Sequence, residues 1–123
     1  MTKIMVVDDE SALLHLVSEV LSEDLGHEVF THESAESAIQ ALNENRELFP
    51  DLLITDYKMH GMTGAKLIET VHTEMKSIKN VLLTGYLEKD IQETLVPYET
   101  ICIRKPVSLA SLEKLIDEVL ELK

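Results

Sequence analysis

The sequence is poor in cysteine, glycine and basic residues, and each shortage excludes a class of protein. The single cysteine, Cys102, permits no internal disulfide, so a reducing cytoplasm is the expected location. The four glycines form neither of the glycine-rich motifs that bind nucleotide phosphates. Basic residues number 11 against 23 acidic ones and form no cluster, which argues against binding to nucleic acid.

Long apolar runs are also missing. No stretch approaches the length of about 18 residues that a membrane span requires. The N-terminal residues enter a predicted strand at once, unlike a signal peptide. The net charge of −12 disfavours an anionic membrane surface and favours a divalent cation or a basic partner. The length of 123 residues and the apolar content of 45% predict one domain over residues 1–123.

Short apolar segments alternate with helical periodicity along the chain. The predicted strands are rich in Val, Ile and Leu. They cover residues 4–7, 28–31, 52–55, 81–84 and 101–104. A predicted helix follows each strand, and three helices have serine caps at Ser11, Ser34 and Ser108. Because strand–helix–strand crossovers are right-handed, five such units predict an α/β fold with an open, doubly wound parallel sheet.

Polar residues stand at the carboxyl ends of four predicted strands, where an open parallel sheet binds its ligands. They are Asp8, Asp9, Asp56, Thr84 and Lys105. If these strands are neighbours, the side chains meet in one pocket. Three carboxylates raise one another's pKa and one lysine does not offset them, so a divalent cation is expected. Mg²⁺ suits the pocket best, because it takes one or two carboxylates and leaves room for waters and a phosphoryl group.

The same residues are suited to phosphoryl transfer. Asp56 could act as a nucleophile that forms an aspartyl phosphate. A cation, the Lys105 ammonium and the Thr84 hydroxyl would stabilise charge on the phosphoryl oxygens. Each residue alone has an ordinary explanation, such as an acid at a helix N-terminus, a solvated lysine or a threonine that caps a turn. Their combination at one sheet edge favours a functional site.

Four stretches of the sequence, in order, carry a family resemblance. VVDDES, LLITDYKMHGMTG, VLLTG and RKP resemble the response-regulator receiver domains of two-component signalling. The resemblance covers the whole chain and implies a flavodoxin-like sheet in the order 2-1-3-4-5 with five helices. It implies a phosphohistidine donor on a sensor histidine kinase or a histidine phosphotransfer domain. It also implies a signalling switch, read by an unidentified protein target, rather than an enzyme with turnover on an external substrate.

The resemblance also implies a role for each matching residue. The implied catalytic residues are Asp56, Thr84 and Lys105. The implied Mg²⁺ ligands are Asp8, Asp9, Asp56 and the backbone carbonyl of Lys58. Within this set, Asp9 is expected to bind the ion directly and Asp8 mostly through water. The peptide bond between Lys105 and Pro106 is expected to be cis.

The sequence departs from the family pattern in two informative places. His60 follows Met59 in the loop after the third strand, where a proline is usual. Cys102 stands where the family has a Tyr or Phe whose ring moves inward on activation. Either Tyr86 supplies this ring or the output switch is altered. Tyr86 and Lys58 are also expected to lengthen the lifetime of the phosphoryl group.

Three functions compete at this point. The first is a stand-alone receiver that is phosphorylated on Asp56. The second is a phosphorylation-independent adaptor of the same fold that acts by docking, which the altered position Cys102 favours and the intact acids oppose. The third is an aspartate-nucleophile phosphatase. That class needs Asp-x-Asp after the first strand, where this chain has Glu10 as the third residue.

Overall fold

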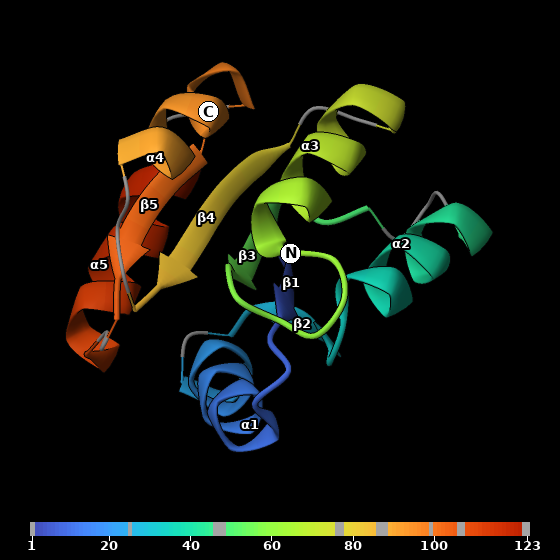
Figure 1. Ribbon diagram of the computed structural model, residues 1–123. Coiled ribbons are helices and arrows are strands. Elements are labelled where there is room, and N and C mark those ends of the chain that lie inside the picture. Colours follow the sequence, from blue (N-terminus) through green and yellow to red (C-terminus); the bar gives the residue numbers. More distant parts are fainter. Residues whose placement is uncertain are drawn as a thin grey trace.

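The fold is a parallel β-sheet covered by helices on both faces (Figure 1). The computed structural model describes residues 2–24, 26–45, 49–75, 78–85, 89–98, 100–105 and 108–121. The strands are β1 (Lys3–Val7), β2 (Glu28–His32), β3 (Leu52–Asp56), β4 (Lys79–Thr84) and β5 (Thr100–Arg104). Their order in the sheet is β2-β1-β3-β4-β5, which confirms the predicted order.

Each strand is followed by a helix, as the alternating pattern predicts. The helices are α1 (Ser11–Glu19), α2 (Ala35–Glu44), α3 (Gly64–Glu74), α4 (Lys89–Leu95) and α5 (Leu109–Glu121). A π-helical turn, η1 (Val20–Asp24), extends α1, and a 3₁₀ turn, η3 (Val96–Tyr98), extends α4. Among the described residues, no helix combines the length and the apolar character that crossing a bilayer demands.

Alternating residues of the strands build two separate hydrophobic cores. Met5 and Val7 of β1 face one core, which α2, α3 and α4 cover. Ile4 and Val6 of the same strand face the other core, which α1 and α5 cover. Because both faces are buried, the central strands read as continuous apolar runs in the sequence. In a parallel sheet covered on both faces, a ligand site is expected at the edge where the strands end.

Two of the three predicted serine caps are present. The Ser34 hydroxyl accepts a hydrogen bond from the Ser37 N–H at 3.0 Å, and the Ser108 hydroxyl accepts one from the Ser111 N–H at 3.1 Å. The predicted cap at Ser11 is wrong by one residue, because the Glu10 carbonyl already accepts the first hydrogen bond of α1. Glu10 makes no side-chain cap, and its N–H donates to an Asp8 carboxylate oxygen at 2.9 Å.

Helix α5 is attached to the sheet by a lysine at the start of β4. The Lys79 ammonium donates a hydrogen bond to the carbonyl of Val119 at 2.6 Å. This carbonyl lies in the last turn of α5, where carbonyls have no partner within the helix. The contact therefore satisfies a helix end and joins α5 to the sheet edge opposite the candidate site.

Candidate functional site

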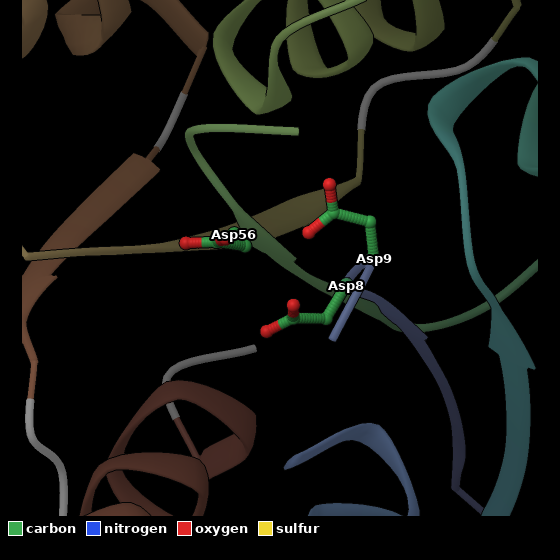
Figure 2. A group of neighbouring side chains, drawn as sticks. All are labelled: Asp8, Asp9 and Asp56. Atoms are coloured by element: carbon green, nitrogen blue, oxygen red, sulfur yellow. The ribbon is translucent and has the colours of Figure 1, made fainter. Parts of the chain in front are cut away.

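Three carboxylates gather where β1 and β3 end (Figure 2). Asp8 and Asp9 directly follow β1, and Asp56 is the last residue of β3. The two strands are neighbours in parallel register, with Val7 opposite Thr55, so their ends come together. One oxygen from each carboxylate lies within 4.8 Å of the others. Oxygen donors at this spacing suit a hard divalent cation such as Mg²⁺.

Lys105 brings one positive charge to this cluster. Its ammonium nitrogen lies 3.1 Å from Asp56 Oδ1 and 3.3 Å from Asp8 Oδ2. Its backbone N–H donates to the carbonyl of Thr84 at 2.7 Å, so the ends of β4 and β5 fix its position. The Asp8 side chain is only 5% exposed, and burial of this kind weakens solvent screening of the ion pair.

Burial and charge compete at the centre of the site. Burial raises the pKa of Asp56, the charge of Asp8 raises it further, and Lys105 offsets these effects only in part. Burial alone would lower the pKa of Lys105, but the hydrogen bond to Asp56 and the charges of both carboxylates outweigh it and raise that pKa. The lysine therefore stays charged while the charge of Asp56 is only partly compensated, and a bound cation would relieve this.

Asp9 lies on the outer side of the cluster and contacts the loop after β3. Its Oδ2 atom accepts a hydrogen bond from the His60 backbone N–H at 3.0 Å. The Nδ1 atom of the His60 ring lies 2.9 Å from the same oxygen. The backbone hydrogen bond from His60, with a smaller contribution from the ring, lowers the pKa of the Asp9 carboxyl. Asp9 is thus held ionised and oriented by one loop residue.

The remaining predicted site residues lie around the carboxylates. Thr84 is the last residue of β4 and is buried, with 4% exposure. Lys58 follows β3 and lines, with Asp9, Met59 and His60, a cavity of about 250 Å³. Lys58 therefore lies next to the proposed cation ligand Asp9. The direction of its carbonyl toward an ion stays a prediction.

Some expectations fall outside the described residues. Tyr86 and Pro106 are among them. The roles of Tyr86 as the moving ring and in lengthening the lifetime of the phosphoryl group therefore stay predictions, as does the cis peptide bond before Pro106. Cys102 does lie in the described part of β5, where it is half-buried and packs against the core beneath α3 and α4. Burial raises the pKa of its thiol, so Cys102 is a packing residue of β5 rather than a reactive thiol.

The loop between β3 and α3 is fixed by contacts that the sequence did not indicate. A Cβ atom at Gly64 would lie 2.0 Å from the backbone oxygen of Asp56, so only glycine fits. The Met62 N–H donates to a carboxylate oxygen of Glu36 on α2 at 3.1 Å. Gly61 precedes it with φ +82°, a conformation that favours glycine. No sequence signal distinguishes Glu36 from the other acidic residues of the chain.

Known proteins match both the sequence and the fold. Residues 4–117 match the family model of the response regulator receiver domain. The chain belongs to this family. Receiver domains are phosphoacceptor signalling modules of two-component systems that bind Mg²⁺ in an acidic pocket and interact with histidine kinases or phosphotransfer proteins. The carboxylate oxygens of this receiver domain fit that ion.

Individual relatives support the family assignment. Sporulation initiation phosphotransferase F of Bacillus subtilis (strain 168) is 29% identical over 122 residues, which cover 98% of this chain and 95% of that protein. Two-component response regulator ARR10 of Arabidopsis thaliana is 30% identical, but the chain spans only 21% of its length. The crystal structure of a CheY-like receiver domain protein from Methanospirillum hungatei JF-1 matches with a TM-score of 0.87 and 30% identity, covering 98% of this chain and 94% of that chain.

Proposed function

We propose that this receiver domain accepts a phosphoryl group on Asp56 in a Mg²⁺-dependent reaction and then signals by a conformational switch. The donor is a phosphohistidine on a sensor histidine kinase or a histidine phosphotransfer domain. The observation that carries the proposal is the position of Asp56, within 4.8 Å of two other carboxylates and 3.1 Å from the Lys105 ammonium. The proposed nucleophile, the proposed cation ligands and the Lys105 ammonium thus lie close together.

The reaction forms one bond and breaks one. An oxygen of the Asp56 carboxylate attacks the phosphorus atom, and the phosphorus–nitrogen bond to the donor imidazole breaks. Asp8, Asp9, Asp56 and the Lys58 carbonyl would hold Mg²⁺, which neutralises charge on the phosphoryl oxygens when bound. Lys105, already beside Asp56, would donate to one phosphoryl oxygen, and Thr84 would donate to another.

We also propose that residues 1–123 form one receiver domain and that it acts in the cytoplasm. The match to 95% of the sporulation phosphotransferase supports this organisation, whereas the plant regulator carries a receiver-like segment in a much longer chain. The net charge of −12 supports a protein partner with a basic surface over nucleic acid or an anionic membrane.

The decisive experiment is labelling with acetyl phosphate, a small-molecule phosphodonor. We expect wild-type protein to gain one phosphoryl group in the presence of Mg²⁺, seen by intact-protein mass spectrometry, and none after chelation. Asp56→Asn should abolish labelling, whereas Asp117→Asn, which changes an exposed acid on α5, should not. Transfer from a phosphorylated histidine phosphotransfer domain would then test the natural class of donor.

A phosphorylation-independent adaptor is the second candidate, because Cys102 replaces the moving aromatic ring expected in β5. A wild-type protein that stays unlabelled at saturating Mg²⁺ and donor would contradict the receiver function and support the adaptor. Multiple turnover on phosphomonoesters would instead support a phosphatase, the third function considered from the sequence.

A further inference from the structure

His60 introduces an imidazole nitrogen beside a cation site whose proposed ligand atoms are all oxygens. Its ring nitrogen Nδ1 lies 2.9 Å from Asp9 Oδ2, and its backbone N–H donates to the same oxygen. The His60 side chain is fully exposed, so no packing opposes a small rotation of the ring. The backbone hydrogen bond meanwhile keeps the residue at the site whatever the ring does.

The spacing of these two atoms is that of two ligands on one metal ion. Adjacent donors on an octahedral ion with bonds of about 2.1 Å lie about 3 Å apart. The observed 2.9 Å between His60 Nδ1 and Asp9 Oδ2 matches this separation. Two lone pairs at this distance repel unless a proton or a cation lies between them. A divalent cation bound by Asp9 would take the place of the bridging proton once the exposed ring turns its Nδ1 lone pair toward the ion.

A cavity lies at the same place. It measures about 250 Å³ and is lined by Asp9, Lys58, Met59 and His60. A water molecule occupies about 30 Å³ of liquid, so the cavity has room for an ion that keeps part of its hydration shell. Asp9 and Lys58 are also two of the residues proposed to bind Mg²⁺. His60 therefore lines the same cavity as two of the four proposed Mg²⁺ ligands.

We propose that His60 adds an imidazole ligand to the cation site and shifts its selectivity from Mg²⁺ toward late first-row transition ions such as Ni²⁺, Co²⁺ and Zn²⁺. Mg²⁺ prefers oxygen donors, whereas these ions bind imidazole strongly. An oxygen-only site shows a smaller preference for these ions, because it offers them no imidazole nitrogen. The inference rests on the proposed cation site at Asp8, Asp9 and Asp56, and it concerns which ions that site accepts.

Calorimetric titration of Ni²⁺ and Mg²⁺, each alone, tests the proposal. We expect His60→Gln to weaken Ni²⁺ binding about tenfold or more and to change Mg²⁺ binding by less than about twofold. His27→Gln, which removes a histidine that precedes β2, should change neither affinity. Asp9→Asn should weaken both ions, because it removes a ligand that they share.

Two results would overturn the inference. Unchanged Ni²⁺ affinity in His60→Gln would show that the ring is no ligand, and equal weakening of both ions would show that it only positions Asp9. Acetyl phosphate labelling of wild-type protein with Mg²⁺ is measured in parallel. If the protein is not labelled, the proposed receiver function is contradicted, but a Ni²⁺ preference that depends on His60 can still be present. The failure of the receiver function and the failure of the His60 proposal are therefore distinguishable.

Discussion

At Asp56, burial and the charge of Asp8 act against ionisation while Lys105 favours it, and the net effect is a raised pKa. An acid with a raised pKa in the folded state costs stability when it is ionised. This cost is fully present above the folded-state pKa and disappears below the ordinary value of 3.8. The residue most suited to receive a phosphoryl group is therefore one that destabilises the fold at neutral pH.

Asp56→Asn should consequently stabilise the protein when divalent cations are chelated. We expect a gain of about 1 kcal/mol in the free energy of unfolding at pH 7, because one under-compensated charge is removed. The gain should shrink as the pH falls toward 3.8, where wild-type Asp56 becomes protonated. Urea denaturation at several pH values measures it, with Asp117→Asn as the control. A variant less stable than wild type at pH 7 would contradict this account.

Lys105 should have opposite effects on ion binding and on chemistry. Lys105→Met removes the positive charge between Asp8 and Asp56, so a cation is attracted more strongly and Mg²⁺ should bind up to about tenfold tighter. Labelling of Asp56 by acetyl phosphate should fall at least about tenfold, because a phosphoryl oxygen loses a charged donor. Calorimetry and mass spectrometry measure the two effects. The exposed Lys114 provides the matched control, and parallel changes in both quantities would refute the prediction.

For individual residues, the sequence predicted the carboxylate cluster but not the contacts made by the loop between β3 and α3. Asp8, Asp56 and Lys105 could be placed because each follows a recognisable strand, and parallel strands end at one edge. The contacts His60–Asp9 and Met62–Glu36 depend on the path of an irregular loop, which no periodic pattern encodes.

Among the elements, the connection from β3 to α3 is the most constrained. Gly64 begins α3, and its N–H donates to the carbonyl of Tyr57 at 2.9 Å. Its α-carbon lies so close to the Asp56 backbone that an added Cβ has no space. Asp56 is thus positioned by the start of the following helix as well as by its own strand.

Gly64→Ala should therefore disturb both stability and phosphorylation. We expect a loss of more than about 2 kcal/mol in the free energy of unfolding, because the backbone oxygen of Asp56 must move. Gly85→Ala is the matched control, since a Cβ there meets no atom within 4 Å, and it should change stability by less than about 0.5 kcal/mol. Chemical denaturation compares them. Similar effects of the two substitutions would refute the steric argument.

The elements themselves were largely predictable. Buried parallel strands are continuous apolar runs, and amphipathic helices repeat with a different period, so their identity follows from the pattern. The residues at which helices begin and end were harder to predict than the helices themselves. Ser11 has the right residue type for an N-cap, but α1 begins one residue earlier because Glu10 already accepts the first helical hydrogen bond. No periodic pattern in the sequence distinguishes the π-helical turn after α1 from a continued α-helix.

For the whole molecule, a specific cation site must be distinguished from general screening of an acidic surface. The net charge is −12, so any salt reduces repulsion across the molecule. Binding at the carboxylate cluster instead follows mass action and saturates. The two effects separate when ionic strength is held constant and single acids are replaced.

Mg²⁺ should raise the melting temperature of wild-type protein more than NaCl at equal ionic strength does. At a Mg²⁺ concentration ten times the dissociation constant we expect a stabilisation of about 1.4 kcal/mol, which raises the melting temperature by about 5 °C. Asp9→Asn should lose this excess, because Asp9 belongs to the cluster, while Asp117→Asn on the exposed face of α5 should keep it. Differential scanning calorimetry measures the shifts. Equal shifts in MgCl₂ and NaCl would contradict a specific site.

The strand order is a property of the whole molecule, and local sequence patterns were not sufficient to predict it. Any of the apolar strands could pair with any other on composition alone, so the order came from the family resemblance. The sheet confirms it, with β1 between β2 and β3. The burial of each strand agrees with its place in the sheet. The central strands β1, β3 and β4 are mostly buried, whereas the edge strands β2 and β5 are partly exposed.

The contact between Lys79 and Val119 has a mechanical consequence for signalling. It pins the carboxyl-terminal turn of α5 to the start of β4. A rod that is held at one end pivots about that end, and its opposite tip travels farthest. The free tip of α5 is the end that follows Lys105, so a shift of that lysine would displace this tip most and the pinned end least.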